Sequence, residues 1–333
     1  VTFFPRSQAS YHWYTLAGNP TVSGSSDGIG SGAKFYNPFG VAVDSSGNVY
    51  VADWGNCTVR KVTGAGVVST VAGTAGVAGS TDGFGSSALF GARIAVGATV
   101  RNVGPEGIAV DSSGNLFVGD TNHTIRQITQ AGFVSTFAGR AGAFGTPTTL
   151  NYPSGISVSS TGVLYVSDEG DNVIRVITAQ GAISTLTGIQ QVSGRTDGQG
   201  SGALFNHPYS AALDSAGNIF VADALNNVIR KVTTGGTATT YAGVGISGSD
   251  DGTTTGGLFG GGAMFNLPYG TAVDAAGYVY VSDGYNNTIR LITPGGQVTT
   301  IGGQALVSGS ADGTGSAARF NSPHGIAVDS SGA

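Results

Sequence analysis

Short apolar runs separated by glycine-containing turns recur along the whole chain. In the first copy of this pattern the runs cover residues 40–44, 49–52, 58–62 and 67–72. They are rich in Val, Ile, Phe and Tyr and have the length of strands, which favours a sheet over helices. The turn at residues 45–48 contains the glycine that a tight hairpin needs. Each copy of the pattern therefore predicts four antiparallel strands.

The segment from Phe39 to Asp53 is the clearest part of an internal repeat. The aspartates that end the corresponding segments are 67, 48, 55 and 60 residues apart. Because the spacing varies while the strand sequences are nearly constant, the insertions are expected in loops. Four-stranded units repeated in this way predict an all-β fold, the β-propeller. The other copies run from Glu106 to Asp120, Ser154 to Asp168, Tyr209 to Asp223 and Tyr269 to Asp283, and a sixth begins at His324.

Five complete copies and a split sixth predict six blades in one domain over residues 1–333. Residues 14–18 match the fourth-strand residues 69–73, so we expect the two termini to close the last blade together. The second-strand text of the sixth copy is missing after Ala333. Two explanations stay open: the natural chain continues, which we favour, or a strand from another subunit fills the gap.

Composition narrows the class of protein. Glycine contributes 58 of 333 residues, which disfavours helix and fits a chain rich in turns. Only 10% of residues are charged, and 14 basic against 19 acidic side chains exclude the basic face of a nucleic-acid-binding protein. A hydrophobic content of 40% argues against disorder, and no apolar run is long enough for a membrane helix. The uncharged Gly/Ser/Thr-rich composition favours an extracellular protein.

The repeated text Phe-Asn-x-Pro-x-Gly-x-Ala-Val-Asp-x-x-Gly-x-x-Tyr-Val-x-Asp-x-x-Asn-x-x-Ile-Arg resembles the NHL repeat. Residues 265–290 follow it almost letter for letter, and the resemblance covers essentially the whole chain. The connector Asp-Gly-x-Gly-x-x-Ala-x-Phe is similar to that of many bacterial extracellular proteins and of the teneurin propeller. The resemblance implies a β-propeller that serves as a binding or scaffold module, and it says little about the ligand.

Two charged positions recur in every complete copy, and we interpret both as structural. An Asp ends each second strand, and an Arg lies in each third strand in the same register, where the two side chains can pair beside a turn. The residue three positions after this Asp is Asn56, His123, Asp171, Asn226 or Asn286. The aspartates are Asp53, Asp120, Asp168, Asp223 and Asp283, and the arginines are Arg60, Arg126, Arg175, Arg230 and Arg290.

The Asp-Gly connector is interpreted as a turn that packs the phenylalanine following it. Calcium binding is the alternative, but no Asp-x-Asp-x-Asp loop is present. The connector is missing between Gly139 and Tyr152. Its aspartates are Asp27, Asp82, Asp197, Asp251 and Asp312, and the phenylalanines are Phe35, Phe90, Phe205, Phe259 or Phe265, and Phe320. The repeat text also creates three Asn-x-Thr sequons, at Asn56, Asn122 and Asn286.

One position differs from copy to copy although its neighbours do not. It follows the proline at the start of each first strand, and we call it the first-strand position. The first strand lines the central channel of a propeller, so we expect these residues to ring one mouth of the channel and bind a ligand or peptide. A variable loop surface without a ligand is the alternative. The residues are Phe39, Glu106, Ser154, Tyr209, Tyr269 and His324, with His207 beside them.

Three functions remain open. The first, which we favour, is a non-enzymatic extracellular module that binds a protein or a glycan, without metal or other cofactor, nucleic acid or membrane insertion. The second is a structural subunit that self-assembles by strand addition. The third is a metal-dependent hydrolase or lyase, because six-bladed relatives include lactonases and an amidating lyase. Only Glu106, His207 and His324 suit a metal near the ring, and no Gly-x-Ser-x-Gly motif occurs, so we predict no catalytic or metal site.

Overall fold

The computed structural model describes residues 11–96, 99–254 and 261–329, and the regular elements among them are strands and single turns of 3₁₀ helix. The all-β prediction is therefore confirmed. The chain divides into two compact units. The first unit comprises residues 15–171 and 175–184, and the second comprises residues 1–14, 172–174 and 185–333.

Within the described ranges, no helix has the length and apolar character that crossing a bilayer requires.

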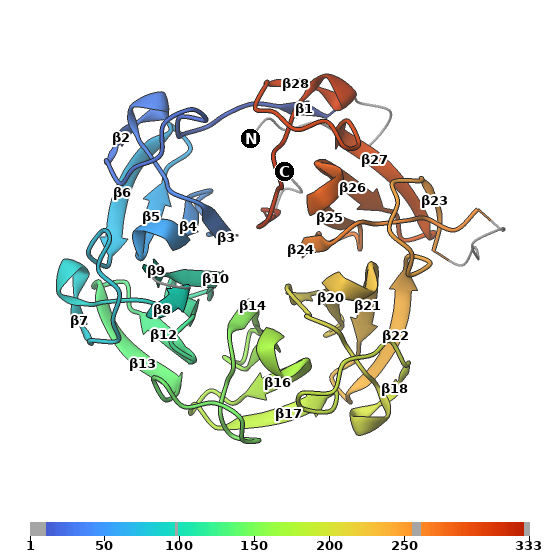
Figure 1. Cartoon of the computed structure of the whole chain (residues 1–333), viewed down its shortest axis with the longest axis horizontal. Helices are drawn as coiled ribbons and strands as arrows, with labels where there is room; N and C mark the ends of the chain where they lie inside the picture. Colours follow the sequence, from blue (N-terminus) through green and yellow to red (C-terminus); the bar gives the residue numbers. More distant parts are fainter. Residues whose placement is uncertain (1–10, 97–98, 255–260, 330–333) are drawn as a thin grey trace. The chain divides into compact units, whose positions relative to one another are not determined.

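The sheets of the first unit follow the predicted order of four antiparallel strands (Figure 1). The first blade consists of β3 (Pro38–Val43), β4 (Val49–Asp53), β5 (Thr58–Val62) and β6 (Val67–Ala72), with β2 (Gly28–Ile29) added at the outer edge. The second consists of β10 (Pro105–Val110), β11 (Leu116–Asp120), β12 (Thr124–Ile128) and β13 (Phe133–Gly139), with β7 (Gly83–Phe84) at its edge.

A third blade begins in the first unit, and two more lie in the second. The third has four strands and no edge strand: β14 (Pro153–Val158), β15 (Leu164–Asp168), β16 (Val173–Ile177) and β17 (Ile183–Thr187). The fourth contains β19 (Ala212–Leu213), β20 (Ile219–Asp223), β21 (Val228–Val232) and β22 (Thr237–Ala242), edged by β18 (Gly198–Gln199). The fifth contains β24 (Pro268–Val273), β25 (Val279–Asp283), β26 (Thr288–Ile292) and β27 (Gln297–Gly303), edged by β23 (Gly252–Thr253).

The described residues thus form five blades, and the prediction of six is wrong in number. The sixth copy contributes only the pairing of β1 (His12–Trp13) with β28 (Gly313–Thr314), in the register that β6 and β2 use in the first blade. Residues 324–328 pack against the fifth blade through Ile326 and Val328, but they form no strand. A first strand needs a second strand as its hydrogen-bonding partner, and the described residues contain none beside residues 324–328. The turn predicted at residues 330–333 lies outside the described residues.

Glycine at the start of the first strands lets neighbouring strands approach closely. A methyl group added at Gly40 would overlap the carbonyl oxygen of Glu106, and one at Gly107 would overlap that of Ser154. Figure 1 accordingly shows β3, β10 and β14 side by side. The fourth blade has Ser210 at this position, and the Ser210 hydroxyl accepts the Ala222 N–H at 3.2 Å. This side-chain bond replaces a ladder bond, which explains why β19 is short.

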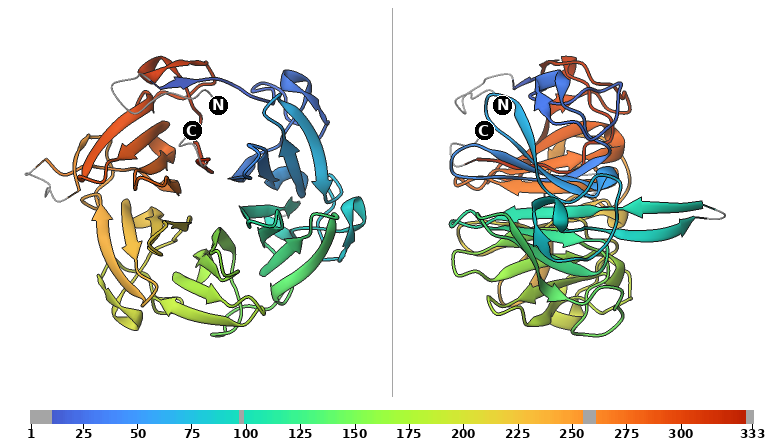
Figure 2. Two further views of the ribbon diagram at one scale, coloured as in Figure 1. Left: turned by 180° about the vertical axis from the view of Figure 1, so that it is seen from behind. Right: turned by 90° about the vertical axis from the view of Figure 1, so that its left-hand side faces the viewer.

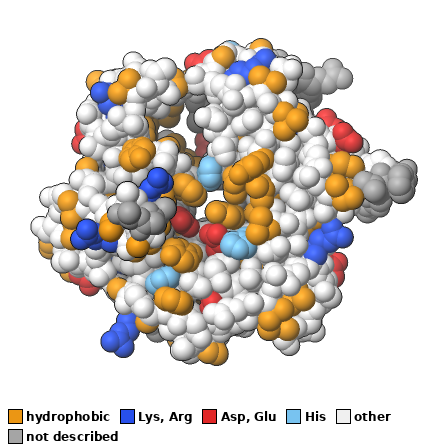
Figure 3. Space-filling model, viewed as in Figure 1, with side chains coloured by type: hydrophobic (Ala, Val, Ile, Leu, Met, Phe, Trp, Pro, Cys, Tyr) orange, Lys and Arg blue, Asp and Glu red, His pale blue; other side chains and the backbone are white. Residues whose placement is uncertain are grey.

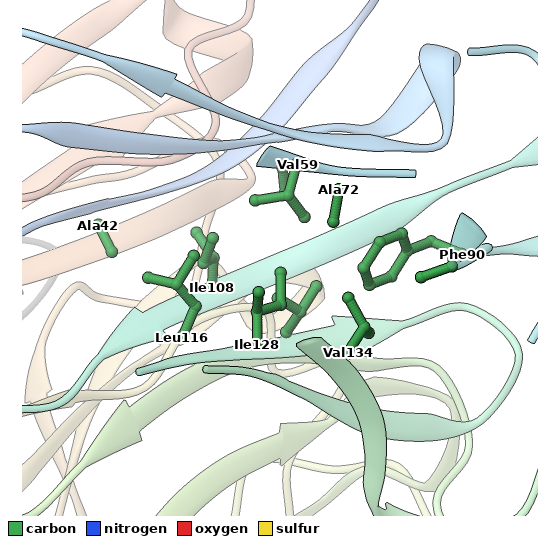
Figure 4. Close-up of a cluster of buried hydrophobic side chains, with 11 residues drawn as sticks. Ala42, Val59, Ala72, Phe90, Ile108, Leu116, Ile128 and Val134 are labelled. Carbon is green, nitrogen blue, oxygen red and sulfur yellow. The ribbon is translucent and has the colours of Figure 1, made fainter. Parts of the chain in front are cut away.

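Apolar side chains fill the space between neighbouring blades. In the first unit, Val59 and Ala72 of the first blade pack with Phe90, Ile108 and Leu116 of the second copy (Figure 4). An equivalent cluster joins the two blades of the second unit. The second and third strands are buried on both faces over most of their length, whereas the first strands β3 and β19 are only partly buried.

Each repeated arginine is fully buried and holds two aspartates, and we call this group the arginine clamp. In the first blade, Arg60 Nη1 lies 2.9 Å from Asp53 Oδ2 and Nη2 lies 2.7 Å from Asp27 Oδ1. The guanidinium also stacks 5.2 Å from the ring centroid of Phe35. The connector aspartate therefore pairs with the arginine, a role that the turn interpretation did not include. The same arrangement recurs at Arg126, Arg230 and Arg290, with Asp82, Asp197 and Asp251 and with Phe90, Phe205 and Phe265; Phe259 lies outside the described residues.

The third blade keeps its clamp although its connector is missing. Arg175 Nε lies 2.7 Å from Asp168 Oδ2, and Nη2 lies 2.8 Å from Asp171 Oδ2. Asp171 occupies the turn position that asparagine holds in the first, fourth and fifth blades. It thus supplies the second carboxylate that the connector provides elsewhere.

A two-stranded hairpin, β8 (Ala92–Val96) and β9 (Thr99–Val103), is inserted between Phe90 and Pro105. Figure 2 shows it extending away from the blades of the first unit. Its base is held by the Thr121 hydroxyl, which donates to the Val103 carbonyl at 2.9 Å, and by Gly104, which lies against the Trp54 carbonyl. This hairpin accounts for the longest spacing between copies.

Candidate ligand-binding site

The residues at the first-strand positions fall into two groups, one in each unit. Phe39, Glu106 and Ser154 belong to the first unit and come from β3, β10 and β14. Tyr209, Tyr269, His324 and His207 belong to the second unit.

In the first unit, Glu106 lies among acidic and aromatic side chains. Its Oε2 is buried and has no hydrogen-bonding partner among the described residues. Burial raises the pKa of Glu106 well above its ordinary value, and the negative charges of Glu169 and Asp120 raise it further. The Trp54 N–H opposes this rise, but its geometry falls short of a hydrogen bond, because Trp54 Nε1 is also buried without a partner.

Trp54 is placed by a single turn of 3₁₀ helix, η2 (Trp54–Asn56), directly after the Asp that ends β4. Its ring lies 5.5 Å from that of Phe39, with an interplanar angle of 32°. The two rings form an aromatic wall in the same group as Glu106. We call Glu106, Glu169, Trp54 and Phe39 together the Glu106 site.

Two predicted residues do not present their side chains in the expected way. Ser154 is buried, with its hydroxyl 3.4 Å from the Ser167 carbonyl oxygen. His207 takes the left-handed backbone conformation before Pro208, and its N–H donates to Asn172 Oδ1 at 2.8 Å. The backbone of His207 therefore has a structural role in the turn.

In the second unit, three first-strand residues form one aromatic cluster. The rings of Tyr269 and His324 stack 4.4 Å apart and are nearly parallel, at 4°. Tyr209 meets Tyr269 edge to face at 5.0 Å, and the exposed Tyr285 lies 6.5 Å from Tyr269 on another side. We call Tyr209, Tyr269, His324 and Tyr285 the aromatic cluster.

His324 is held in an orientation suited to stacking. Its Nδ1 lies 2.7 Å from the Ser322 carbonyl oxygen. Burial lowers the pKa of His324, although the contact with Ser322 opposes the change. The lowered pKa favours the neutral form of the ring, so the cluster presents mainly uncharged rings.

Sequence reasoning missed Trp54, Glu169 and Tyr285. The first two follow directly after the Asp that ends a second strand, and Tyr285 is one residue further on. The residue after this Asp varies between copies as much as the first-strand position does: it is Trp54, Thr121, Glu169, Ala224 or Gly284. That variation was the signal that could have identified them.

The sequon asparagines lie inside the turns of the clamp. Asn56 is buried, and its Nδ2 donates to Asp53 Oδ2 and to the Gly24 carbonyl, both at 2.7 Å. Asn286 makes the same two kinds of contact, and in the second blade Asn122, two residues after Asp120, donates to Asp120. A glycan on these nitrogen atoms would break the contacts that form the turns.

The protein has few charged side chains that could bind a charged ligand or a metal ion. Most side chains on the face drawn in Figure 3 are uncharged. Within the described ranges, no three His, Cys, Asp or Glu side chains come together in a group that could hold a metal ion.

The comparisons with known proteins agree with the repeat and the fold. The NHL repeat family matches residues 35–62, the segment that runs from Phe35 through β3 and β4 to the end of β5. Residues 35–62 therefore carry an NHL repeat, and the blades are those of a β-propeller. A search of curated proteins found no match to it.

Solved structures similar to this propeller cover most of its length. A structural genomics protein of unknown function from Bacteroides thetaiotaomicron is 21% identical, with a TM-score of 0.70 over 95% of this chain and 70% of its own. An auxiliary nutrient binding protein from Bacteroides ovatus is 18% identical, with a TM-score of 0.64 over 95% and 71%. A virginiamycin B lyase from Staphylococcus aureus is 16% identical, with a TM-score of 0.52 over 87% and 74%. At these identities the likeness concerns the fold.

Proposed function

We propose that the protein is a non-enzymatic extracellular binding module that recognises a glycan through the aromatic cluster. The observation that carries the proposal is the set of packed rings from three first-strand positions, Tyr209, Tyr269 and His324. Aromatic faces with a few polar groups are typical of ligand sites, because the rings bury apolar surface while hydroxyl and imidazole groups orient the ligand. A sugar ring offers both an apolar C–H face and hydroxyl groups.

The environment of the cluster supports an uncharged ligand. Its rings are tyrosines and a neutral histidine, which suit hydroxyl-rich molecules better than anions. The similarity to a nutrient binding protein from Bacteroides ovatus agrees with a binding role. Other propellers of similar fold are lyases, but a shared fold does not transfer chemistry, and no observation on this chain favours catalysis.

A glycan array followed by titration of the best-bound glycan tests the proposal. We expect Tyr269→Ala to weaken binding by at least about tenfold, because the central ring of the cluster is lost. Tyr14→Ala is the matched control, since Tyr14 is an exposed tyrosine outside the cluster, and it should bind like the wild type. Melting temperatures of both variants show whether the fold is retained. Absence of glycan binding, or equal binding by folded Tyr269→Ala, contradicts the proposal.

A further inference from the structure

The side-chain Oε2 of Glu106 is buried, and no cation among the described residues forms an ion pair with Glu106. Each clamp aspartate has an arginine, with the closest pairs at 2.7 to 3.0 Å in four of the five blades. Glu106 forms no ion pair within the described part of the chain, and its Oε2 lacks any partner there. Burying an uncompensated charge is unfavourable, so a positive group arriving from solution would stabilise this site.

The surroundings of Glu106 add negative potential. Glu169 from η4 (Glu169–Asp171) and Asp120 from β11 both act on Glu106 through their charge. Asp120 has Arg126, at the comparatively long distance of 3.7 Å. The site therefore attracts positive charge, and its walls on the side of β3 and η2 are the rings of Phe39 and Trp54.

We propose that the Glu106 site binds an organic cation, a protonated or quaternary amine. Carboxylates supply the counter-charge, and the faces of Trp and Phe attract ammonium groups. This proposal goes beyond the glycan-binding function, because it concerns the first unit and does not depend on the aromatic cluster.

An organic cation fits these residues better than a metal ion does. Calcium takes six to eight oxygen ligands, and magnesium prefers an octahedral shell. The Glu106 site offers two carboxylates and two aromatic rings, and the described residues contain no group of three or more metal-binding side chains. An amine is less strongly hydrated and can exchange water for aromatic surface.

The site lies at the edge of the solvent-accessible surface. Glu106 and Trp54 are both partly exposed as residues, although Glu106 Oε2 and Trp54 Nε1 are themselves buried. The base of the β8–β9 hairpin packs against η2 through Gly104, and Thr121 ties Val103 to the second blade. The backbone that carries Trp54 is thus supported by the base of the hairpin, which helps to preorganise the site.

Calorimetric titration with choline and with its uncharged analogue 3,3-dimethylbutan-1-ol tests the charge requirement. We expect choline to bind and the alcohol to bind at least about tenfold more weakly, because only choline carries the positive charge. Choline binding should persist in calcium chloride. Equal binding of choline and the alcohol, no choline binding, or displacement of choline by calcium overturns the proposal.

Variants locate the binding on the Glu106 site. Glu106→Gln and Trp54→Leu should each weaken choline binding by about tenfold or more, whereas Trp54→Phe, which keeps an aromatic ring, should weaken it less. Asp250→Asn removes one exposed negative charge in the second unit and is the matched control. Unchanged choline binding by folded Glu106→Gln overturns the proposal, whatever the result of the glycan experiments.

Proton release gives an independent readout. A bound cation favours ionised Glu106 and lowers its pKa, so choline binding should release protons in the pH range over which free Glu106 titrates, and there its heat should change with the ionisation enthalpy of the buffer. Glu106→Gln should abolish this dependence. Buffer-independent heat in the wild type contradicts the role of Glu106. A modified lysine side chain of a protein carries the same kind of cation as a free amine. Titration with a trimethyl-lysine peptide beside choline therefore distinguishes a protein ligand from a small molecule, and the ligand that binds more tightly is the better model.

Discussion

At the scale of the residue, the arginine clamp shows what a repeated ion pair does in a nearly uncharged protein. Burial raises the pKa of Asp223 to about 6, although Asn226, Asn206 and Arg230 all stabilise its charge. The free-energy cost of desolvating the carboxylate therefore offsets much of the stabilisation that the ion pair with Arg230 provides. The clamp therefore contributes mainly by fixing the positions of three segments. One arginine in a third strand binds the aspartate that ends a second strand and the aspartate of a connector.

The third blade shows that this geometry can be built in two ways. Where the connector aspartate is missing, Asp171 in the turn pairs with Arg175, and the blade has no edge strand. The second blade differs in another way, since its turn is one residue shorter and Asn122 rather than His123 bonds to Asp120. Spacing alone had assigned His123 to that role.

Asp171→Asn should destabilise the protein by about 1–3 kcal/mol, because buried Arg175 loses one of its two carboxylates. The free energy of unfolding from urea titration measures the effect. Asp250→Asn makes the same chemical change at an exposed site, where we expect a change within about 0.5 kcal/mol. Equal effects of the two substitutions would show that Asp171 does not have the compensating role.

At the scale of the element, the β8–β9 hairpin is an addition to a complete blade. Without residues 92–103 the second copy would read Phe90-Gly91-Gly104-Pro105, the same length as residues 35–38 of the first copy. Its strands were not predicted, although two β-branched runs separated by Gly97 and Ala98 are the usual hairpin signal. The spacing between copies predicts only a loop insertion at this point, because the hairpin is not part of the repeat.

Deletion of residues 92–103 should leave the fold intact. The bond from the Gly91 N–H to Asp120, at 2.6 Å, lies outside the deleted segment. We expect a melting temperature within about 5 °C of the wild type, because shortening a surface connection changes stability little. Circular dichroism and thermal melting check this. Loss of cooperative unfolding would mean that the hairpin is part of the blade.

At the scale of the whole molecule, the sequence predicted the blades but not their number. The strands, turns and clamp pairs are encoded in the repeated sequence. Each copy forms a sheet whose strands bond mainly to one another. The sixth blade was inferred by counting first strands, whereas a blade also needs a second strand. The pairing of β1 with β28 is the part of that inference for which both strands exist.

The sequence identifies the first-strand positions as candidates, but it does not show what surrounds each side chain. Variation at the first-strand positions pointed to Phe39, Glu106, Tyr209, Tyr269 and His324. It could not show that Ser154 is buried, or that Trp54 and Glu169 lie beside Glu106. Those contacts depend on how neighbouring copies pack against each other. The sequence pattern within one copy carries no information about that packing.

Hydrogen-exchange mass spectrometry with and without the glycan selected on the array tests the central claim, that the first-strand positions of a repetitive scaffold bind the ligand. We predict that the glycan protects peptides covering residues 207–213, 267–273 and 322–326, which carry the aromatic cluster. Protection confined to the connectors at residues 244–254 and 304–318 would contradict the account.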